Sequence, residues 1–220
     1  KRAGAAAALD PLRKVLHDPV VDVRVAAAAA VAAVAGAAAL PDLTRLLTDE
    51  DVAVRKAGLE ALCEMESPAA IAAMASACCD SDESVRLVAT WALGERAAGA
   101  AALCERLAAD ESAEVRASAA SGLSHLRERD PQVGEDVLRS ALSDPSEEVR
   151  LRALRALIAD PQDRELVSWS VYYYDYPDQL VDGDMVMGAT KAIGENDAQV
   201  RARYEGLARR FGVRLAWSNE

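Results

Sequence analysis

DSDESVRLVATWALGE, residues 80–95, decides the fold, because close copies of this stretch recur along the chain. The other copies begin at Asp18, Asp49, Asp110 and Asp144, and each one places its aspartate six residues before an arginine. These marker arginines follow one another at steps of 31, 31, 30 and 34 residues: Arg24, Arg55, Arg86, Arg116 and Arg150. A fixed period in this range is typical of a stacked repeat array.

The composition indicates helices. Hydrophobic residues make up 51% of the 220 residues and aromatic residues only 4%, with alanine, leucine, valine and arginine dominant. This is the composition of a helical chain with little strand signal. Since a repeat array grows along one axis, we expect one elongated all-α domain over residues 1–220.

Charge and cysteine content restrict the function. The formal net charge of -11 argues against nucleic acid as the main ligand, because lysine and arginine must neutralise phosphates, and it favours a basic protein partner. The four cysteines form no CxxC pair, which argues against a zinc site or a disulfide framework and indicates a reducing cytoplasm. The alanine-rich start is too short for a membrane span. Because position 1 is Lys, we expect a longer parent product.

Each repeat reads as a pair of helices. The position seven residues after the marker arginine is apolar in every copy, which predicts a buried stripe: Val31, Leu62, Leu93, Leu123 and Leu157. N-caps are predicted four residues before the arginine at Asp51, Asp82, Ser112 and Ser146, whereas Val20 predicts a weaker start. Second helices are predicted over residues 39–48, 68–79, 99–109 and 131–143.

The ends of the chain are less regular. Residues 1–17 predict an orphan helix, residues 18–160 hold the regular repeats, residues 161–184 form a Tyr-rich insert, and residues 185–220 form an atypical closing repeat and tail. The closing repeat is recognised because MVMGATKAIGE, which starts at Met185, aligns with VRLVATWALGE. End repeats commonly diverge in this way.

The five copies of D-x-x-x-x-V-R resemble the HEAT repeats of the bacterial phycobilisome-lyase-like subtype, over roughly residues 9–210. The resemblance implies a right-handed α-solenoid of about six antiparallel helix pairs, with the first helices outside and the second helices lining a concave face. It also implies a ladder of ion pairs between successive units: Asp49, Arg55, Asp80, Arg86, Asp110, Arg116, Asp144 and Arg150.

Two features of the regular repeats are candidates for partner binding. The turns before the first helices carry many carboxylates, which would form either an acidic ridge that steers a cationic partner or a solvated edge that assists the helix dipoles. Trp91 stands in a column that reads as outward-facing, with Ala29, Glu60, Ser121, Arg155 and Lys191. Its side chain is either an exposed interface anchor or packed under a neighbouring side chain.

The Tyr-rich insert is the other candidate. It concentrates aromatic side chains that combine apolar area with a polar tip: Trp169, Tyr172, Tyr173, Tyr174 and Tyr176. These residues either bind a partner or fill the junction with the closing repeat. The last helix, DAQVRARYEGLARRFG, would contact an acidic partner or nucleic acid, or would form a solvated cap. It is rich in arginine, and one more follows it: Arg201, Arg203, Arg209, Arg210 and then Arg214.

Catalytic patterns do not stand out. There is no Ser/His/Asp order, phosphate loop or zinc spacing, and we expect no catalytic residue, metal or cofactor. Cys78 and Cys104 read as buried small apolar residues, and the exposed Cys79 has nothing nearby to activate it.

The sequence therefore favours a non-enzymatic interaction module, with a concave face and an insert that bind another protein, and the negative net charge favours a basic one. The alternatives are an inhibitor or immunity-type protein that masks a basic enzyme, and a lyase or lyase-chaperone subunit for a chromophore-like ligand.

Overall fold

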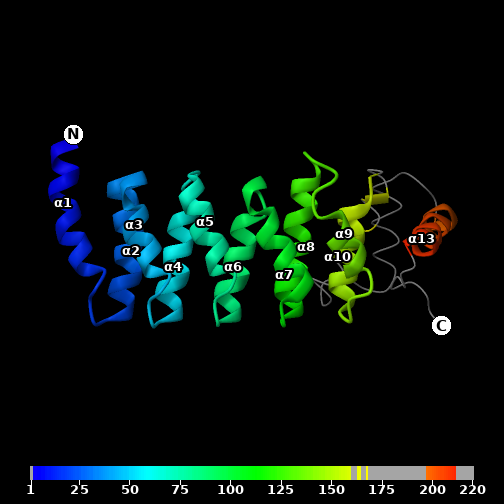
Figure 1. Ribbon diagram of the computed structural model, residues 1–220, viewed down its shortest axis with the longest axis horizontal. Helices are drawn as coiled ribbons and strands as arrows, with labels where there is room; N and C mark the ends of the chain where they lie inside the picture. The colour runs from blue at the N-terminus through cyan, green and yellow to red at the C-terminus, as the bar shows by residue number, and fades with distance from the viewer. Residues whose placement is uncertain (1, 160–162, 165–166, 168–196, 212–220) are drawn as a thin grey trace. The chain divides into compact units, whose positions relative to one another are not determined.

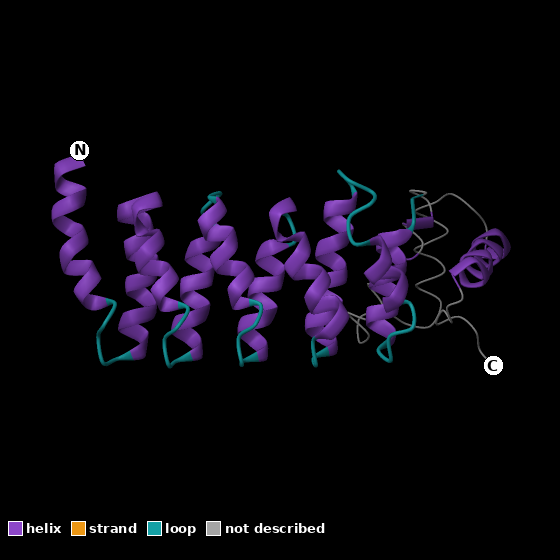
Figure 2. Ribbon diagram, viewed as in Figure 1, coloured by secondary structure: helices purple, strands orange, loops and turns teal. Residues whose placement is uncertain are grey.

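The computed structural model describes residues 2–159, 163–164, 167 and 197–211. Helices joined by short loops make up this part of the chain, and it contains no strand (Figure 2). The Tyr-rich insert and the first helix of the closing repeat lie almost entirely outside the described residues. The chain forms two compact units, Lys1–Leu103 and Cys104–Glu220, which are described separately below.

The first unit is a stack of helix pairs (Figure 1). Helix α2 packs against α1 and α4, and α4 packs in turn against α6; α3 packs against α4 and α5. First helices thus contact first helices and second helices contact second helices, as in an α-solenoid. The elements are α1 (Arg2–Val15), α2 (Val21–Ala35), η1 (Gly36–Ala39), α3 (Leu40–Leu46), α4 (Val52–Cys63), α5 (Pro68–Ala77), α6 (Glu83–Leu93) and η2 (Ala97–Gly99).

The second unit continues the helix-pair pattern. Helix α10 packs against both α8 and α9. Its elements are α7, which starts at the end of the first unit (Ala100–Ala109), α8 (Ala113–Arg127), α9 (Glu135–Ala141), α10 (Glu147–Leu157) and α13 (Asp197–Phe211). Helix α9 begins four residues later than predicted because residues 131–134 form a turn that ends at Gly134, with φ of 63°.

The predicted buried stripe forms the core. Val31, Leu62, Leu93 and Leu123 have no exposed surface, which confirms four members of the column. Leu157 is only half-buried, because α10 ends there and the chain turns to an extended conformation at Ile158, which is 3% exposed. Ile158 therefore occupies the buried position that was predicted for Leu157.

Small residues let the helices approach closely. Gly58 on α4 faces α3, and a Cβ atom added to it would lie 3.0 Å from the Leu46 Cβ and 3.3 Å from the Leu43 carbonyl oxygen. Such a contact is tighter than normal packing allows. The small column three residues after the marker arginine therefore sets the spacing between a first helix and the second helix of the preceding pair.

One run, Val21–Leu46, is long and apolar enough to cross a membrane by length and composition alone. It is not one straight helix, because Gly36, with φ of 53°, ends α2 and leads into η1 and α3. Val31 and Leu43 within the run are fully buried against the rest of the protein. The core helix of a repeat passes the same length test, so the run by itself is weak evidence of a span.

The helix starts follow the predicted caps with one exception. The side chains of Asp51, Asp82 and Ser112 accept hydrogen bonds from amides of the first turn, and Val20 makes no cap. Ser146 occupies the cap position in an extended conformation, but its side chain makes no capping hydrogen bond. The predicted cap position of Ser146 is therefore confirmed, whereas its predicted capping hydrogen bond is not formed.

Candidate functional site

The most regular polar feature is the ladder of marker arginines. Arg24 donates from Nε and Nη2 to both carboxylate oxygens of Asp49, at 3.0 and 2.8 Å. Arg55 forms the same bidentate pair with Asp80, at 2.8 and 3.0 Å. Arg116 forms it with Asp144, at 2.8 and 2.9 Å. Each of these three arginines therefore pairs with the aspartate of the following repeat.

The same arginines also fix their own turns. Nη1 of Arg55 donates to the carbonyl oxygens of Asp49 and Glu50, and Arg86 and Arg150 make the corresponding bonds in their turns. Bidentate arginine–carboxylate bonds are strong and directional. The ladder is a structural device that joins one turn to the next.

Burial and hydrogen bonding act in opposite directions on the ladder carboxylates. Burial raises the pKa of Asp49, but hydrogen bonds from Arg24 and from the Asp51 amide outweigh it, so the pKa lies below its ordinary value. The pKa of Asp144 is lowered by the same balance, with Arg116 as the partner. These aspartates remain ionised within their pairs.

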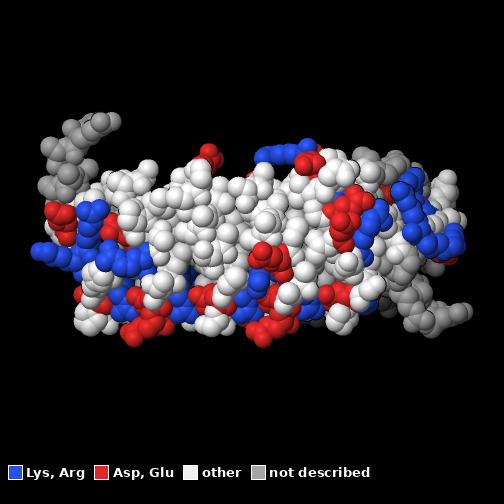
Figure 3. All heavy atoms as spheres, viewed as in Figure 1, with Lys and Arg blue, Asp and Glu red and all other residues white. Residues whose placement is uncertain are grey.

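The turns are less acidic than the sequence alone suggests. Asp49 and Asp80 are neutralised by ladder arginines, which leaves fewer exposed carboxylates, of which Glu50 is one. In the first unit, red and blue atoms lie next to one another along the edge where α2, α4 and α6 begin (Figure 3). The predicted ridge is therefore a mixed edge with an acidic excess.

Trp91 is the most exposed large apolar side chain in the described part of the chain. It lies on α6 with 71% of its surface exposed, compared with 53% for Val20 and 36% for Val34. Glu60 stands at the equivalent position of α4, which packs against α6, and Glu95 follows shortly after α6; both are exposed. The structure thus leaves the Trp91 indole ring open to solvent, with one exposed carboxylate on the neighbouring helix α4 and another just after α6.

The other predicted aromatic residues, Trp169, Tyr172, Tyr173, Tyr174 and Tyr176, lie outside the described residues. In the last helix, α13, Arg203 donates to Asp163 at 2.7 Å, and the Arg210 guanidinium lies 5.2 Å from the centroid of the Phe211 ring. Arg209 and Arg210 are exposed. The basic helix therefore uses at least one of its arginines to hold the protein together.

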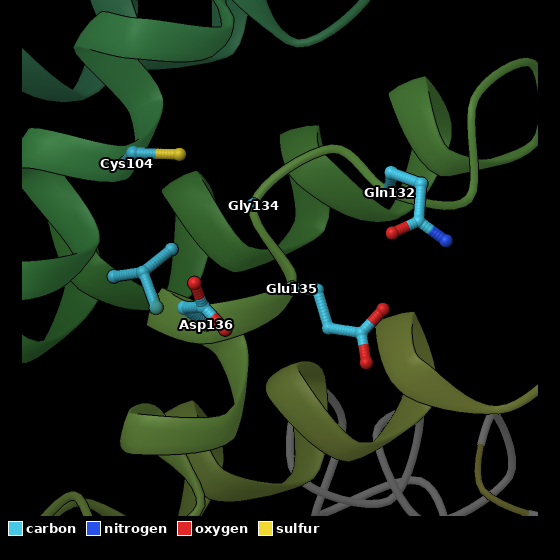
Figure 4. Close-up of a pocket in the computed structure, with 6 residues that line it drawn as sticks. Cys104, Gln132, Gly134, Glu135 and Asp136 are labelled. Atoms are coloured by element: carbon cyan, nitrogen blue, oxygen red, sulfur yellow. The ribbon is translucent and has the colours of Figure 1, made fainter.

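An open cavity of about 560 Å³ lies beside α7 and α9 in the second unit (Figure 4). It is lined by Cys104, Gln132, Gly134, Glu135, Asp136 and Val137. A Cβ atom on Gly134 would lie 3.1 Å from the Leu123 methyl groups and 3.3 Å from the Cys104 Sγ. Only glycine combines this close approach with a positive φ.

The cavity does not have the chemistry of an active site. Cys104 is half-buried and lines the cavity, so the prediction that it belongs to the core is wrong; Cys78 is buried as predicted. Burial raises the pKa of the Cys104 thiol and of the Cys63 thiol, which keeps both in the unreactive protonated form. Among the described residues, no group of three or more His, Cys, Asp or Glu side chains is placed to hold a metal.

Two sets of arginine contacts were not expected from the sequence. Arg96 donates to the carbonyl oxygens of Ala92 and Cys63, and Arg127 donates to that of Ala156. Both side chains thus satisfy carbonyl groups in the last turns of helices. Asp42, which is 4% exposed, accepts from Arg13 and Arg45. The sequence offers one sign of the Asp42 contacts, because Asp42 stands at a repeat position that is apolar in the other copies: Pro11, Ala73, Leu103 and Val137.

Comparison with known proteins identifies the repeats. The model of the HEAT repeats family matches residues 41–102 and 100–167, which together cover more than half of the chain. A search of curated proteins finds no match. The crystal structure of an engineered protein is similar at 19% identity, with a TM-score of 0.47, over 89% of this chain and 97% of that chain.

Proposed function

Because the chain belongs to the HEAT repeat family, we propose that it is a non-enzymatic scaffold that binds another protein. Helix pairs packed on one another leave preformed surfaces, so little conformational entropy is lost when a partner binds. The described residues supply one surface of this kind with the composition of an interface, around Trp91.

The exposure of Trp91 carries the proposal. A tryptophan that is 71% exposed provides a large apolar area at low entropic cost, and tryptophan is enriched among residues that dominate binding energy. Glu60, on the neighbouring helix α4, and Glu95, just after α6, are both exposed. A cationic side chain of a partner would contact the ring face, which attracts cations, while the carboxylates pair with the same charge.

We propose that the partner is a basic protein. The net charge of -11 favours its encounter with such a partner. The aromatic side chains of the Tyr-rich insert would supply a second contact. An inhibitor or immunity-type protein that masks a basic enzyme is one specific form of this function.

Photo-cross-linking tests the proposal. A benzoylphenylalanine is placed at position 91 of the full chain, or at the equivalent exposed position of α2, Ala29, as the control. In lysate of the source cells, position 91 should capture one basic protein, with a yield that falls as salt screens the charges and falls again in Glu60→Gln. Equal capture from both positions, or capture of an acidic protein, would overturn the proposal.

A further inference from the structure

Asp42 departs from the repeat at a buried position. The residues seven before each ladder aspartate are Pro11, Ala73, Leu103 and Val137, and Ala73 and Leu103 are core residues with 9% and 0% exposure. Asp42 occupies the same column and is 4% exposed. Burying a carboxylate costs free energy unless it is paired, so its presence in a single layer calls for a reason.

The carboxylate of Asp42 holds two arginines. Arg13 on α1 donates from Nε to Oδ2 at 2.8 Å, and Arg45 on α3 donates from Nη2 to Oδ1 at 3.2 Å. One oxygen is used for each guanidinium. Asp42 therefore brings together two cations from different helices, which would otherwise repel one another.

These two arginines differ from those of the ladder in their exposure. The side chains of Arg13 and Arg45 are 42% and 58% exposed, whereas those of Arg24, Arg55 and Arg116 are between 8% and 13% exposed. A guanidinium carries five N–H donors. The pair thus presents donors to the solvent from a position fixed by a buried anion.

Other cationic and polar groups surround the pair. His17 Nε2 lies 3.4 Å from Arg45 Nη1, and the exposed Lys14 follows Arg13 in the sequence of α1. Asp10 lies 3.7 Å from Arg13 and is 81% exposed. Arg13, Lys14 and Arg45 give three positive charges against Asp10 and Asp42, and Figure 3 shows lysine and arginine atoms gathered over α1 and α3.

We propose that Arg13 and Arg45, with His17 beside Arg45, form a binding site for a phosphate monoester group. Two side-by-side guanidinium groups match the oxygens of a phosphate, and charge-assisted hydrogen bonds of this kind are strong. A phosphate monoester carries nearly two negative charges and three acceptor oxygens, whereas a carboxylate has one charge and two oxygens. The site is separate from Trp91 and does not depend on the basic partner.

Titration of the ¹⁵N-labelled full chain tests the site. Sodium phosphate is added at about pH 7, where a phosphate monoester is largely dianionic, with ionic strength held constant by sodium chloride. The Nε–Hε signals of Arg13 and Arg45, assigned with Arg13→Lys and Arg45→Lys, should shift together and saturate with a Kd of roughly 1 mM. Acetate, as the carboxylate probe, should bind at least about tenfold more weakly.

Matched variants separate a built site from general surface charge. Arg45→Gln should weaken phosphate binding about tenfold or more, since it removes charge-assisted donors. Arg139→Gln is the control and should leave the affinity unchanged. Arg139 lies on α9 at the repeat position that Arg13 has on α1, and it is 58% exposed, but it pairs with Glu135 on its own helix.

Asp42→Asn tests the role of the buried carboxylate as a positioning residue. General electrostatics predicts tighter binding, because a negative charge is removed, whereas positioning predicts weaker binding, because the arginines are released. Circular dichroism of each variant establishes that its helices are retained, and Arg13→Lys, which keeps the charge but loses the fork, supplies a milder second variant that should also weaken binding.

The source of the phosphate is distinguished by a second probe. A phosphoserine peptide with neutral flanking residues is compared with inorganic phosphate and with the unphosphorylated peptide. Tighter binding of the phosphopeptide assigns the site to a phosphorylated protein, and tighter binding of inorganic phosphate assigns it to a small phosphorylated molecule. Equal binding of acetate and phosphate, an unchanged affinity in Arg45→Gln, or tighter binding by Asp42→Asn would overturn the proposal.

Discussion

The ladder at the helix starts and the Asp42 cluster between α1 and α3 use the same two residue types for different ends. In the ladder, one arginine binds both oxygens of one aspartate and is almost removed from solvent, and the arrangement recurs from repeat to repeat. In the cluster, one aspartate divides its oxygens between two half-exposed arginines, and the arrangement occurs at a position that is apolar in the other repeats. Repetition with burial indicates a structural role, and a single departure with exposure indicates a site that binds.

The largest expected effect is at the ladder. Arg55→Ala leaves the largely buried Asp80 carboxylate, 11% exposed, without its arginine partner, which should lower the free energy of unfolding by about 3 kcal/mol. Urea denaturation followed by circular dichroism measures the loss. Arg139→Ala, which breaks an exposed pair within α9, is the control and should cost less than about 1 kcal/mol; similar losses for the two variants would remove the distinction between the regions.

A smaller effect is expected at the cluster. Asp42→Ala restores the residue type found in the equivalent position of α5, and Arg13 and Arg45 can turn their half-exposed side chains into water. The free energy of unfolding should fall by only about 1–2 kcal/mol, as measured by the same denaturation. A loss as large as that of Arg55→Ala would show that the cluster is a structural ladder pair and weaken the case for a binding site.

The caps allow a finer comparison along the ladder edge. Asp82 accepts from the amides of Ser84 and Val85, so Asp82→Ala should cost about 1 kcal/mol. Ser146 makes no such bond, and Ser146→Ala should change the free energy of unfolding by only about a few tenths of a kcal/mol, as for a surface substitution. Equal costs would mean that the two helix starts behave alike in solution.

The smallest expected effect concerns pH. The pKa of Asp49 is lowered in the folded protein, so its contribution to stability is fully present above the unfolded value of about 3.9 and is lost as the pH falls through the folded pKa. In Asp49→Asn, the unfolding midpoint should therefore fall less steeply with acid over this interval than in the unaltered protein. Asp22→Asn, which changes an exposed carboxylate of α2, should keep the original slope.

The sequence could predict whatever the repeats share. The column of Val31, Leu62, Leu93 and Leu123 and the caps at Asp51 and Asp82 follow from spacing alone, because each layer must bury the same stripe and start the same helix. The late start of α9 and the half-buried Leu157 could not be predicted in this way. The first depends on the turn over residues 131–134 and the second on where α10 ends, and neither feature is shared by the other repeats.

The candidate sites were harder to predict for a related reason. The position of Trp91 in a mostly polar column indicated an outward direction, and the structure shows its exposure, while its role in binding remains a prediction. The contact of Arg13 with Asp42 joins residues 29 apart in a single layer, and a repeat alignment shows Asp42 only as an irregularity. A long-range pair that occurs once leaves no periodic signal.

The ladder also has a direction. Each arginine grips the carbonyl groups of its own turn and reaches forward to the aspartate of the next, 25 residues later in Arg24 and Arg55. If one whole period such as residues 49–79 were duplicated, Arg55 would face the copied aspartate and the copied arginine would face Asp80, both at the original separation of 25 residues. Such a molecule can be lengthened in whole steps by gene duplication, whereas an insertion of a few residues into a helix would break the forward link.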